Sequence, residues 1–312
     1  MSDPANEWEN NAISKLAEAG LQEQKRARRW GIFFKSLTFV YLTVILLAYI
    51  GPQVSKATTS RHTALIEMNG VIADDEAASA DNIIAALQDA FENKHSAGVI
   101  LRINSPGGSP VQSGVIYDEI KRLRAEYPDK PLYAVVSDVC ASGGYYVAAA
   151  ADRIFADKAS IVGSIGVRMD NFGFVDAMKK FGVERRTLTA GENKALFDPF
   201  APVNTAAKQH LQNMLDDIHQ QFISAVKTGR GERLDLNTKG LFSGLIWTGE
   251  QAKAIGLVDD LASTDYVARV VIGSDNIANY TRQEDLFERL AGRVGTSLGL
   301  ILNKNIGFLQ LH

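Results

Sequence analysis

The sequence has little of the chemistry that several common kinds of site require. Cys140 is the only cysteine among 312 residues, which excludes an internal disulfide and a thiolate cage for a metal. Five histidines are present, and none of them lies between His95 and His210. The net charge is only −3, and no basic cluster occurs in the globular part, so nothing indicates nucleic-acid binding. The chain also has no internal repeat and no low-complexity tract.

The longest apolar run lies near the N-terminus, at residues 31–50. It contains one charge, Lys35, and its length matches that of a helix that crosses a bilayer. Four of residues 25–29 are basic, so the positive-inside rule predicts a cytoplasmic N-terminus and an extracytoplasmic remainder. A cleaved signal peptide would have a shorter leader with fewer acids, and a core helix would have a polar face. We therefore predict a single transmembrane helix at 31–50.

From Thr63 onward, strands and helices are predicted to alternate, as is typical of an α/β domain. The predicted strands are 64–69, 98–103, 132–137, 153–156 and 183–188. The predicted helices are 80–93, 111–126, 176–181 and 204–227. This alternation predicts parallel βαβ units, with the loops that follow the strands gathered at one edge of the sheet.

The most informative stretch is 138–151, where a predicted strand gives way to a run of small helix formers. Ser142 lies at this junction, and Gly143 and Gly144 after it leave the turn open to close approach by another chain. The free N–H groups and the positive end of the new helix would stabilise an anion beside the Ser142 hydroxyl, as acyl transfer requires. The alternative is that Ser142 is only a helix N-cap and that the glycines permit close packing.

A second glycine-bearing turn, at residues 105–108, precedes another predicted helix. In a parallel sheet, both turns lie at the carboxyl ends of their strands, where ligands usually bind. The amides of Gly108 and Gly143 could then form a two-donor oxyanion hole. By itself the first turn is equally compatible with a type II turn after Pro106. Its pairing with the Ser142 turn, one βα unit later, is the more specific signal.

A nucleophilic serine needs a base, and two kinds are available. His210 and His219 fall in a long predicted helix, where packing or surface roles are common, although folding could still deliver a distant histidine. Lys194 lies among apolar and small residues just beyond a predicted strand. Burial there would favour the neutral amine that a base needs, whereas a solvated loop lysine would have no such role. Cys140 has no nearby histidine to activate it, and we expect it to pack under the turn.

Several motifs occur in order between residues 105 and 259. They are Ser105-Pro-Gly-Gly108, Ala141-Ser-Gly-Gly-Tyr145, Gly163-Ser-Ile-Gly166, Ala190-Gly-Glu-Asn-Lys194, and Trp247-Thr-Gly with Gly256-Leu-Val-Asp259. Together they resemble the signal peptide peptidase SppA family in its short bacterial form, over residues 60–275. The resemblance implies a ClpP/crotonase-type α/β core of repeated βαβ units. The organisation we expect is a cytoplasmic segment (1–30), a transmembrane helix (31–50), a linker (51–62), a protease catalytic domain (63–275) and a C-terminal tail of open role (276–312).

The resemblance also implies roles for single residues. Ser142 corresponds to the family nucleophile and Lys194 to its general base. Ser164 corresponds to the serine that orients the lysine, and the amides of Gly108 and Gly143 to the oxyanion donors.

The activity implied is that of a membrane-anchored serine endopeptidase with a Ser–Lys dyad. Its substrates would be signal-peptide remnants or other apolar, unstructured peptides at the outer face of the bacterial inner membrane. The resemblance further implies a homo-oligomeric ring and no metal or organic cofactor. Two other classes stay open, namely a catalytically idle membrane scaffold with the same fold and an acyl-CoA enzyme of the crotonase type.

Overall fold

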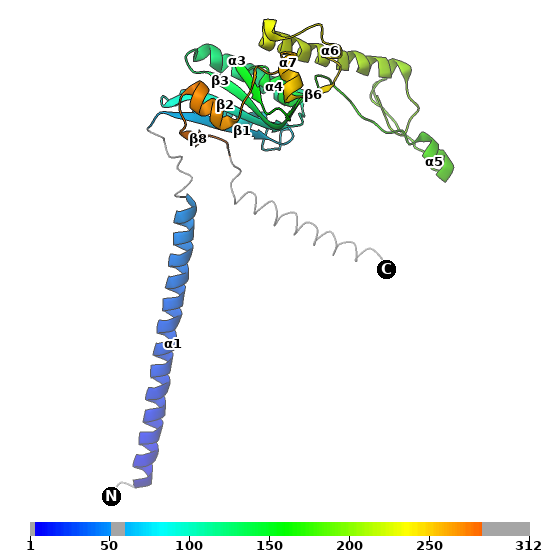
Figure 1. The fold of residues 1–312 in the computed structure, drawn as a ribbon. Coiled ribbons are helices and arrows are strands. Elements are labelled where there is room, and N and C mark those ends of the chain that lie inside the picture. Colours follow the sequence, from blue (N-terminus) through cyan, green and yellow to red (C-terminus); the bar gives the residue numbers. More distant parts are fainter. Residues whose placement is uncertain (1–3, 51–59, 283–312) are drawn as a thin grey trace. The chain divides into compact units, whose positions relative to one another are not determined.

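Residues 4–50 and 60–282 are described in the structure, which is a computed structural model, and the chain divides into two units, 1–57 and 58–312. In the first unit, residues Pro4–Ile50 form one helix, α1 (Figure 1). Across the described residues, no helix combines the length and the hydropathy needed to cross a bilayer. The side chains of 46–50, which end the predicted span, lie outside the described residues, so the transmembrane helix stays a prediction. Residues 51–59 of the predicted linker and residues 283–312 of the predicted tail also lie outside the described residues.

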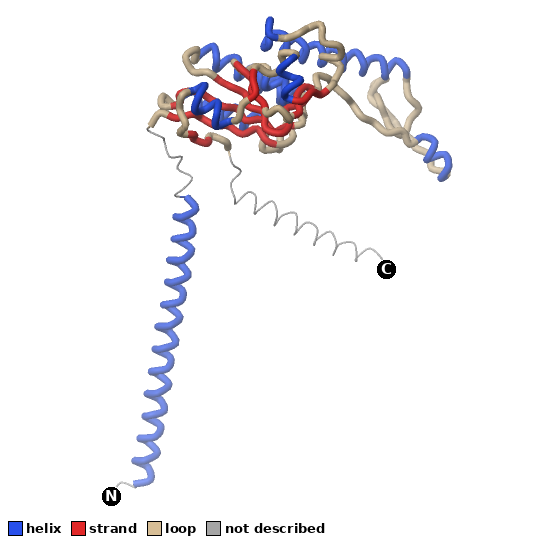
Figure 2. The backbone as a smooth tube through the Cα atoms, in the orientation of Figure 1, coloured by secondary structure: helices blue, strands red, loops and turns tan. Residues whose placement is uncertain are grey.

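One eight-stranded sheet organises the second unit (Figure 2). Its strands are β1 (His62–Asn69), β2 (Ser96–Ser105), β3 (Leu132–Ala141), β4 (Arg153–Ala156), β5 (Ile161–Gly163), β6 (Ile246–Thr248), β7 (Asp260–Leu261) and β8 (Ile277–Asn279). The order along the main path is β6-β5-β3-β2-β1-β8, and β4 and β7 branch from β3. Every described pairing is parallel except that of β5 with β6. The predicted parallel α/β class is confirmed, and β8 carries the sheet beyond the predicted domain boundary at residue 275.

Helices and short helical turns cover both faces of this sheet. They are α2 (Ala80–Glu92), α3 (Pro110–Glu126), α4 (Gly143–Ala148), α6 (Thr205–Arg230), η2 (Gly231–Arg233), α7 (Gly249–Ala254), α8 (Thr264–Tyr266) and η3 (Val267–Ile272). The short helix α5 (Val175–Phe181) has no buried residue and lies apart from the sheet (Figure 1). Because side chains alternate along a strand, Ile66 and Leu101 belong to the larger buried cluster, with α2, α3 and α4. Leu65 and Ile100, one position away, pack with Ile272 of η3 in a second cluster. Burial on both faces explains the continuous apolar runs in β1 and β2.

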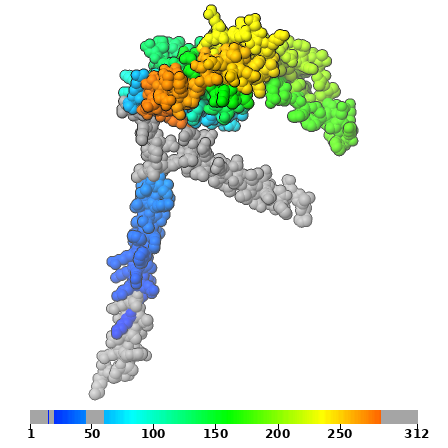
Figure 3. Space-filling view, in the orientation of Figure 1, coloured from blue at the N-terminus to red at the C-terminus, as the bar shows by residue number. Residues whose placement is uncertain are grey.

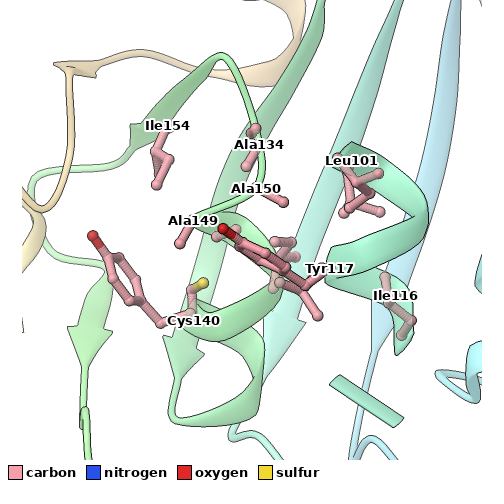
Figure 4. Close-up of a cluster of buried hydrophobic side chains, with 14 of the residues drawn as sticks. Leu101, Ile116, Tyr117, Ala134, Cys140, Ala149, Ala150 and Ile154 are labelled. Carbon is pink, nitrogen blue, oxygen red and sulfur yellow. The ribbon is translucent and has the colours of Figure 1, made fainter. Parts of the chain in front are cut away.

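Cys140 lies in the larger cluster, at the end of β3. Its side chain is fully buried, and Figure 4 shows it beside Ala149, in the same cluster as Ile154. Burial raises the pKa of the Cys140 thiol far above its usual range, which keeps it protonated. The predicted packing role under the Ser142 turn is confirmed.

The predicted strand at 183–188 is wrong. The residues after α5 form a loop without sheet pairing, in which Val183 and Leu188 are exposed. Their β-propensity has no effect because the described part of the chain offers them no partner strand and no core face. The segment from Arg168 to Asn204 instead forms a protrusion that begins after β5 and ends at α6 (Figure 3, green to yellow-green).

A buried ion pair fastens the end of α6 to the sheet. The Arg230 side chain is 1% exposed, and its Nη1 lies 2.7 Å from Oδ2 of Asp259. Arg233 reaches the other carboxylate oxygen at 3.0 Å, and the N–H of Ile154 in β4 donates to Oδ2 at 2.7 Å. Burial raises the pKa of Asp259, but the hydrogen bond and the charge of Arg230 outweigh it, and the net pKa lies below its ordinary 3.8.

Replacing Asp259 with Asn should therefore lower the free energy of unfolding by about 3 kcal/mol at pH 7, because two arginines lose their counter-ion. A carboxylate with a lowered folded-state pKa stabilises the fold above the unfolded-state pKa, and this contribution is lost as the pH falls through the folded value. The difference between wild type and variant should thus shrink below about pH 4. Urea unfolding across pH tests this, with the exposed-turn variant Asp129→Asn as the control. Equal stability of Asp259→Asn and wild type at pH 7 would contradict it.

Candidate active site

Ser142 joins β3 to α4 in a backbone conformation that residues other than glycine rarely adopt, with φ 52° and ψ −123°. Its N–H donates to the carbonyl of Gly163 at 2.8 Å, and its own carbonyl accepts from the N–H of Tyr146 at 3.0 Å. The side chain makes no capping hydrogen bond, whereas Ser79 and Ser109, at the same position before α2 and α3, both cap their helices. The N-cap alternative for Ser142 is therefore wrong, and its half-buried hydroxyl is not used for capping.

The turn between β2 and α3 packs directly against the Ser142 turn. A Cβ atom on Gly107, where φ is 101°, would lie 2.7 Å from the amide nitrogen of Gly143 and 2.7 Å from Cβ of Ser142, so only glycine permits this approach. A Cβ atom on Gly143 would lie 3.3 Å from the amide nitrogen of Gly108, which makes the two amides neighbours. Within the described residues, neither N–H donates a hydrogen bond. Two free donors thus lie beside Ser142, as an oxyanion hole requires.

Ser164 is brought to the same place by strand pairing. Ala141 of β3 pairs with Gly163 of β5, so the residue that follows each of them lies at the same edge of the sheet. Ser164 also has a positive φ, 51°, and its N–H donates to the carbonyl of Leu245 at 2.8 Å. Trp247 packs tightly below it, because a Cβ atom on Gly163 would lie 2.9 Å from the Trp247 ring. The Trp247 side chain of this motif therefore has a structural role, because it packs against the Ser164 turn.

Ser142, Ser164, Gly108 and Gly143 all line one cavity of about 990 Å³. Its walls also carry apolar and aromatic side chains from three helices, namely Val111 and Val115 of α3, Tyr146 of α4, and Ile218 and Phe222 of α6. The sequence analysis missed the contribution of α6. The signal was present, because Ile218 and Phe222 are four residues apart on an amphipathic helix.

Lys194 does not line this cavity within the single chain. It is exposed, in the loop between α5 and α6, and its backbone N–H donates to the carbonyl of Gly191 at 3.1 Å. The burial expected for Lys194 is therefore not present within one copy of the chain. Four of the five predicted site residues come together, and the fifth lies on the protrusion.

No histidine in the described part of the chain lines the cavity either. His210 is exposed on α6. His219 follows the cavity-lining residue Ile218 on α6, and its Nε2 lies 3.2 Å from the carbonyl oxygen of Ile165. Folding does bring this histidine to the Ser164 turn, where it contacts the backbone rather than Ser142.

Comparison with known proteins shows the family of the chain. Residues 124–276 match the family described as Peptidase family S49. A putative protease of Methanocaldococcus jannaschii is 34% identical over 226 residues, which cover 72% of this chain and 71% of that protein. This chain belongs to peptidase family S49. The S49 match contains Ser142, Ser164 and Lys194, whereas Gly108 precedes it.

Other relatives match this chain over only part of their own length. A putative signal peptide peptidase SppA of Enterococcus faecium is 30% identical, over 67% of this chain and 62% of that protein. A Brucella melitensis protein named Na(+)/H(+) antiporter NhaA is 50% identical over 175 residues, which cover 56% of this chain and 24% of the antiporter. Against that protein and its Brucella abortus counterpart, the chain spans about a quarter of the relative's length.

The strain at Ser142 gives a testable prediction. A non-glycine residue held at such dihedral angles costs on the order of 1–3 kcal/mol. Because Ser142→Gly and Ser142→Ala both remove the hydroxyl, their difference isolates the backbone effect, and we expect the glycine variant to be the more stable by about 1 kcal/mol. Chemical denaturation of both variants measures this. At Ser224, an exposed position inside α6, the same pair should have the opposite order, because glycine destabilises a helix interior relative to alanine. A glycine variant at 142 no more stable than the alanine variant would refute the strain.

Proposed function

We propose that this S49 chain is a serine endopeptidase whose nucleophile is Ser142. The observation that carries the proposal is the uncapped, strained Ser142 turn beside the free amides of Gly108 and Gly143. In the proposed reaction the Ser142 hydroxyl loses its proton to a base as its oxygen attacks a peptide carbonyl. The two amides bind the oxyanion, and the base then donates the proton to the leaving amine. Water releases the acyl group by the same steps in reverse.

We propose further that the base is Lys194 of a neighbouring copy of the chain, in a homo-oligomeric ring. Within the described residues, no lysine of the same chain lines the cavity, so the site lacks a base of this kind. The protrusion that carries Lys194 also exposes large apolar side chains, with Phe172 75%, Phe181 83% and Leu188 100% exposed. Exposed apolar surface of this kind is typical of interfaces. Ser164, on the cavity wall, would orient the incoming amine.

The proposed substrates are apolar, unstructured peptides such as signal-peptide remnants. Support comes from the cavity volume of about 990 Å³, from the apolar and aromatic side chains in its walls, and from the name of the Enterococcus faecium relative, a putative signal peptide peptidase. The two other classes explain less. An idle scaffold gives no reason for a strained serine beside free amides, and an acyl-CoA enzyme gives no reason for the Lys194 motif.

We also propose that α1 anchors the enzyme in the bacterial inner membrane, with the catalytic domain outside the cytoplasm. Support comes from the apolar run at 31–50 and the four basic residues within 25–29. Each basic residue near the anionic inner leaflet favours this orientation by about 1 kcal/mol. Protease added to spheroplasts should digest the domain after residue 60, and a fully protected domain would contradict this topology.

Complementation between inactive variants tests the dyad and its arrangement together. Ser142→Ala and Lys194→Ala should each abolish peptidase activity while the assembly is retained. If each site takes Ser142 from one copy and Lys194 from the next, equal mixing followed by reassembly should restore about a quarter of wild-type activity, because half of the serines and half of the lysines are intact. Turnover of a fluorogenic peptide measures this.

The matched control is a mixture of Ser142→Ala with the double variant Ser142→Ala/Lys194→Ala, which has no intact serine and should stay inactive. Zero recovery in the first mixture, with exchange of subunits shown by mass spectrometry, would place both residues of the dyad in one chain. Full activity of Lys194→Ala alone would remove lysine as the base.

A further inference from the structure

One stripe of α3 lines the cavity away from the reacting serine. Its cavity-lining residues are Val111, Gly114, Val115 and Asp118, spaced so that they share one face of the helix. The stripe begins at Val111, close in sequence to the Gly108 amide, because α3 starts at Pro110. With a rise of 1.5 Å per residue, Asp118 lies about 10 Å further along the helix than Val111.

Asp118 is a carboxylate without a counter-ion. It forms no ion pair among the described residues. Lys121 and Arg122 follow three and four residues later on the same side of the helix; Lys121 forms no ion pair in the described part of the chain, and Arg122 is held by Glu119 and Glu126. The cavity wall has one cationic side chain in its described lining, Arg168, and that side chain is paired with Asp170 at 3.5 Å. Among the described residues that line the cavity, Asp118 is thus the one charged side chain without an ion pair.

Aromatic rings lie next to this carboxylate. Tyr117 packs edge-on against Tyr146 with ring centroids 5.3 Å apart, and Tyr146 packs against Phe222 at 4.9 Å. Burial and, after it, the negative charge of Asp118 raise the pKa of the Tyr146 phenol. Asp118 and Tyr146 line the same cavity, so one ligand group there has both a carboxylate and a ring to bind. A carboxylate beside an aromatic ring is a combination that favours an organic cation.

We infer that Asp118 is a specificity-determining residue, which selects peptides with a lysine or arginine side chain about three residues from the scissile bond. The spacing assumes that the peptide runs along α3 from the Gly108 amide, because three extended residues at about 3.3 Å each then cover the distance of about 10 Å between Val111 and Asp118. The inference rests on the proposed peptidase function and makes the substrate class more specific. The preferred peptide has an apolar stretch against Val111, Val115 and Phe222 and a basic side chain at the Asp118 end.

The test compares peptides that differ at one position. Fluorogenic peptides carry lysine, norleucine or glutamate three residues before or three residues after the cleaved bond, and kcat/KM is measured at low and high salt. Wild type should prefer lysine over norleucine about fivefold at one of the two positions, and salt should reduce the preference because the contact is partly exposed. Asp118→Asn should abolish the preference with little effect on the norleucine peptide, and Asp118→Lys should favour glutamate.

The matched control is Asp129→Asn, which removes an exposed carboxylate after the end of α3 and should keep the wild-type preference. Equal kcat/KM for the lysine and norleucine peptides at both positions would overturn the inference and leave the peptidase proposal standing. So would a preference that survives in Asp118→Asn.

A binding measurement separates this result from a failure of the proposed function. Fluorescence anisotropy of the labelled peptides with Ser142→Ala needs no turnover, and the lysine peptide should bind about fivefold more tightly than the norleucine peptide. Adding Asp118→Asn should remove the difference. If wild type cleaves none of the peptides while this binding difference is present, the peptidase proposal fails and the assignment of Asp118 as a cation-selecting residue stands. Absence of the binding difference overturns that assignment.

Discussion

The arrangement of the site depends on how the end of β3 is paired. Residues 133–135 of β3 pair with β4, and residues 139–141 pair with β5, so the strand changes partner along its length. This change leaves the carbonyl of Gly163 in position to accept the N–H of Ser142 at 2.8 Å. One hydrogen bond thus links the two turns that carry Ser142 and Ser164. Without the change of partner, the second serine would lie away from the cavity.

Both serines are held in positive-φ conformations, and the surrounding contacts explain how these are maintained. The Ser142 turn is enclosed by Gly107 and Gly143 on one side and by the buried Cys140 below. The Ser164 turn is held by the carbonyl of Leu245 and by the ring of Trp247. Unfavourable backbone angles persist only where neighbouring structure determines them, and such sites are commonly functional. The strain therefore agrees with the role proposed for Ser142.

The fold and most of the site could be predicted from the sequence because their signals are local. The apolar runs of β1 and β2, and the small residues that surround Ser142, each depend on neighbours within a few positions. The strand predicted at 183–188 is wrong because β-propensity does not specify whether a partner strand exists. The cavity walls from α6 could not be predicted, because the contact of Phe222 with Tyr146 joins distant parts of the chain. The location of Lys194 relative to Ser142 likewise depends on tertiary and, we propose, quaternary structure.

The central claim is that Ser142 is a nucleophile with an oxyanion hole beside it. A fluorophosphonate tests this most directly, because it reacts covalently with an activated serine and its phosphoryl oxygen occupies the oxyanion position. After treatment of the full-length assembly, peptide mass spectrometry should find the adduct on Ser142 and on no other serine, and Gly107→Ala should slow labelling because its Cβ would displace the Gly143 amide. An unlabelled Ser142 in an assembled protein, or an adduct on a different serine, would contradict the account.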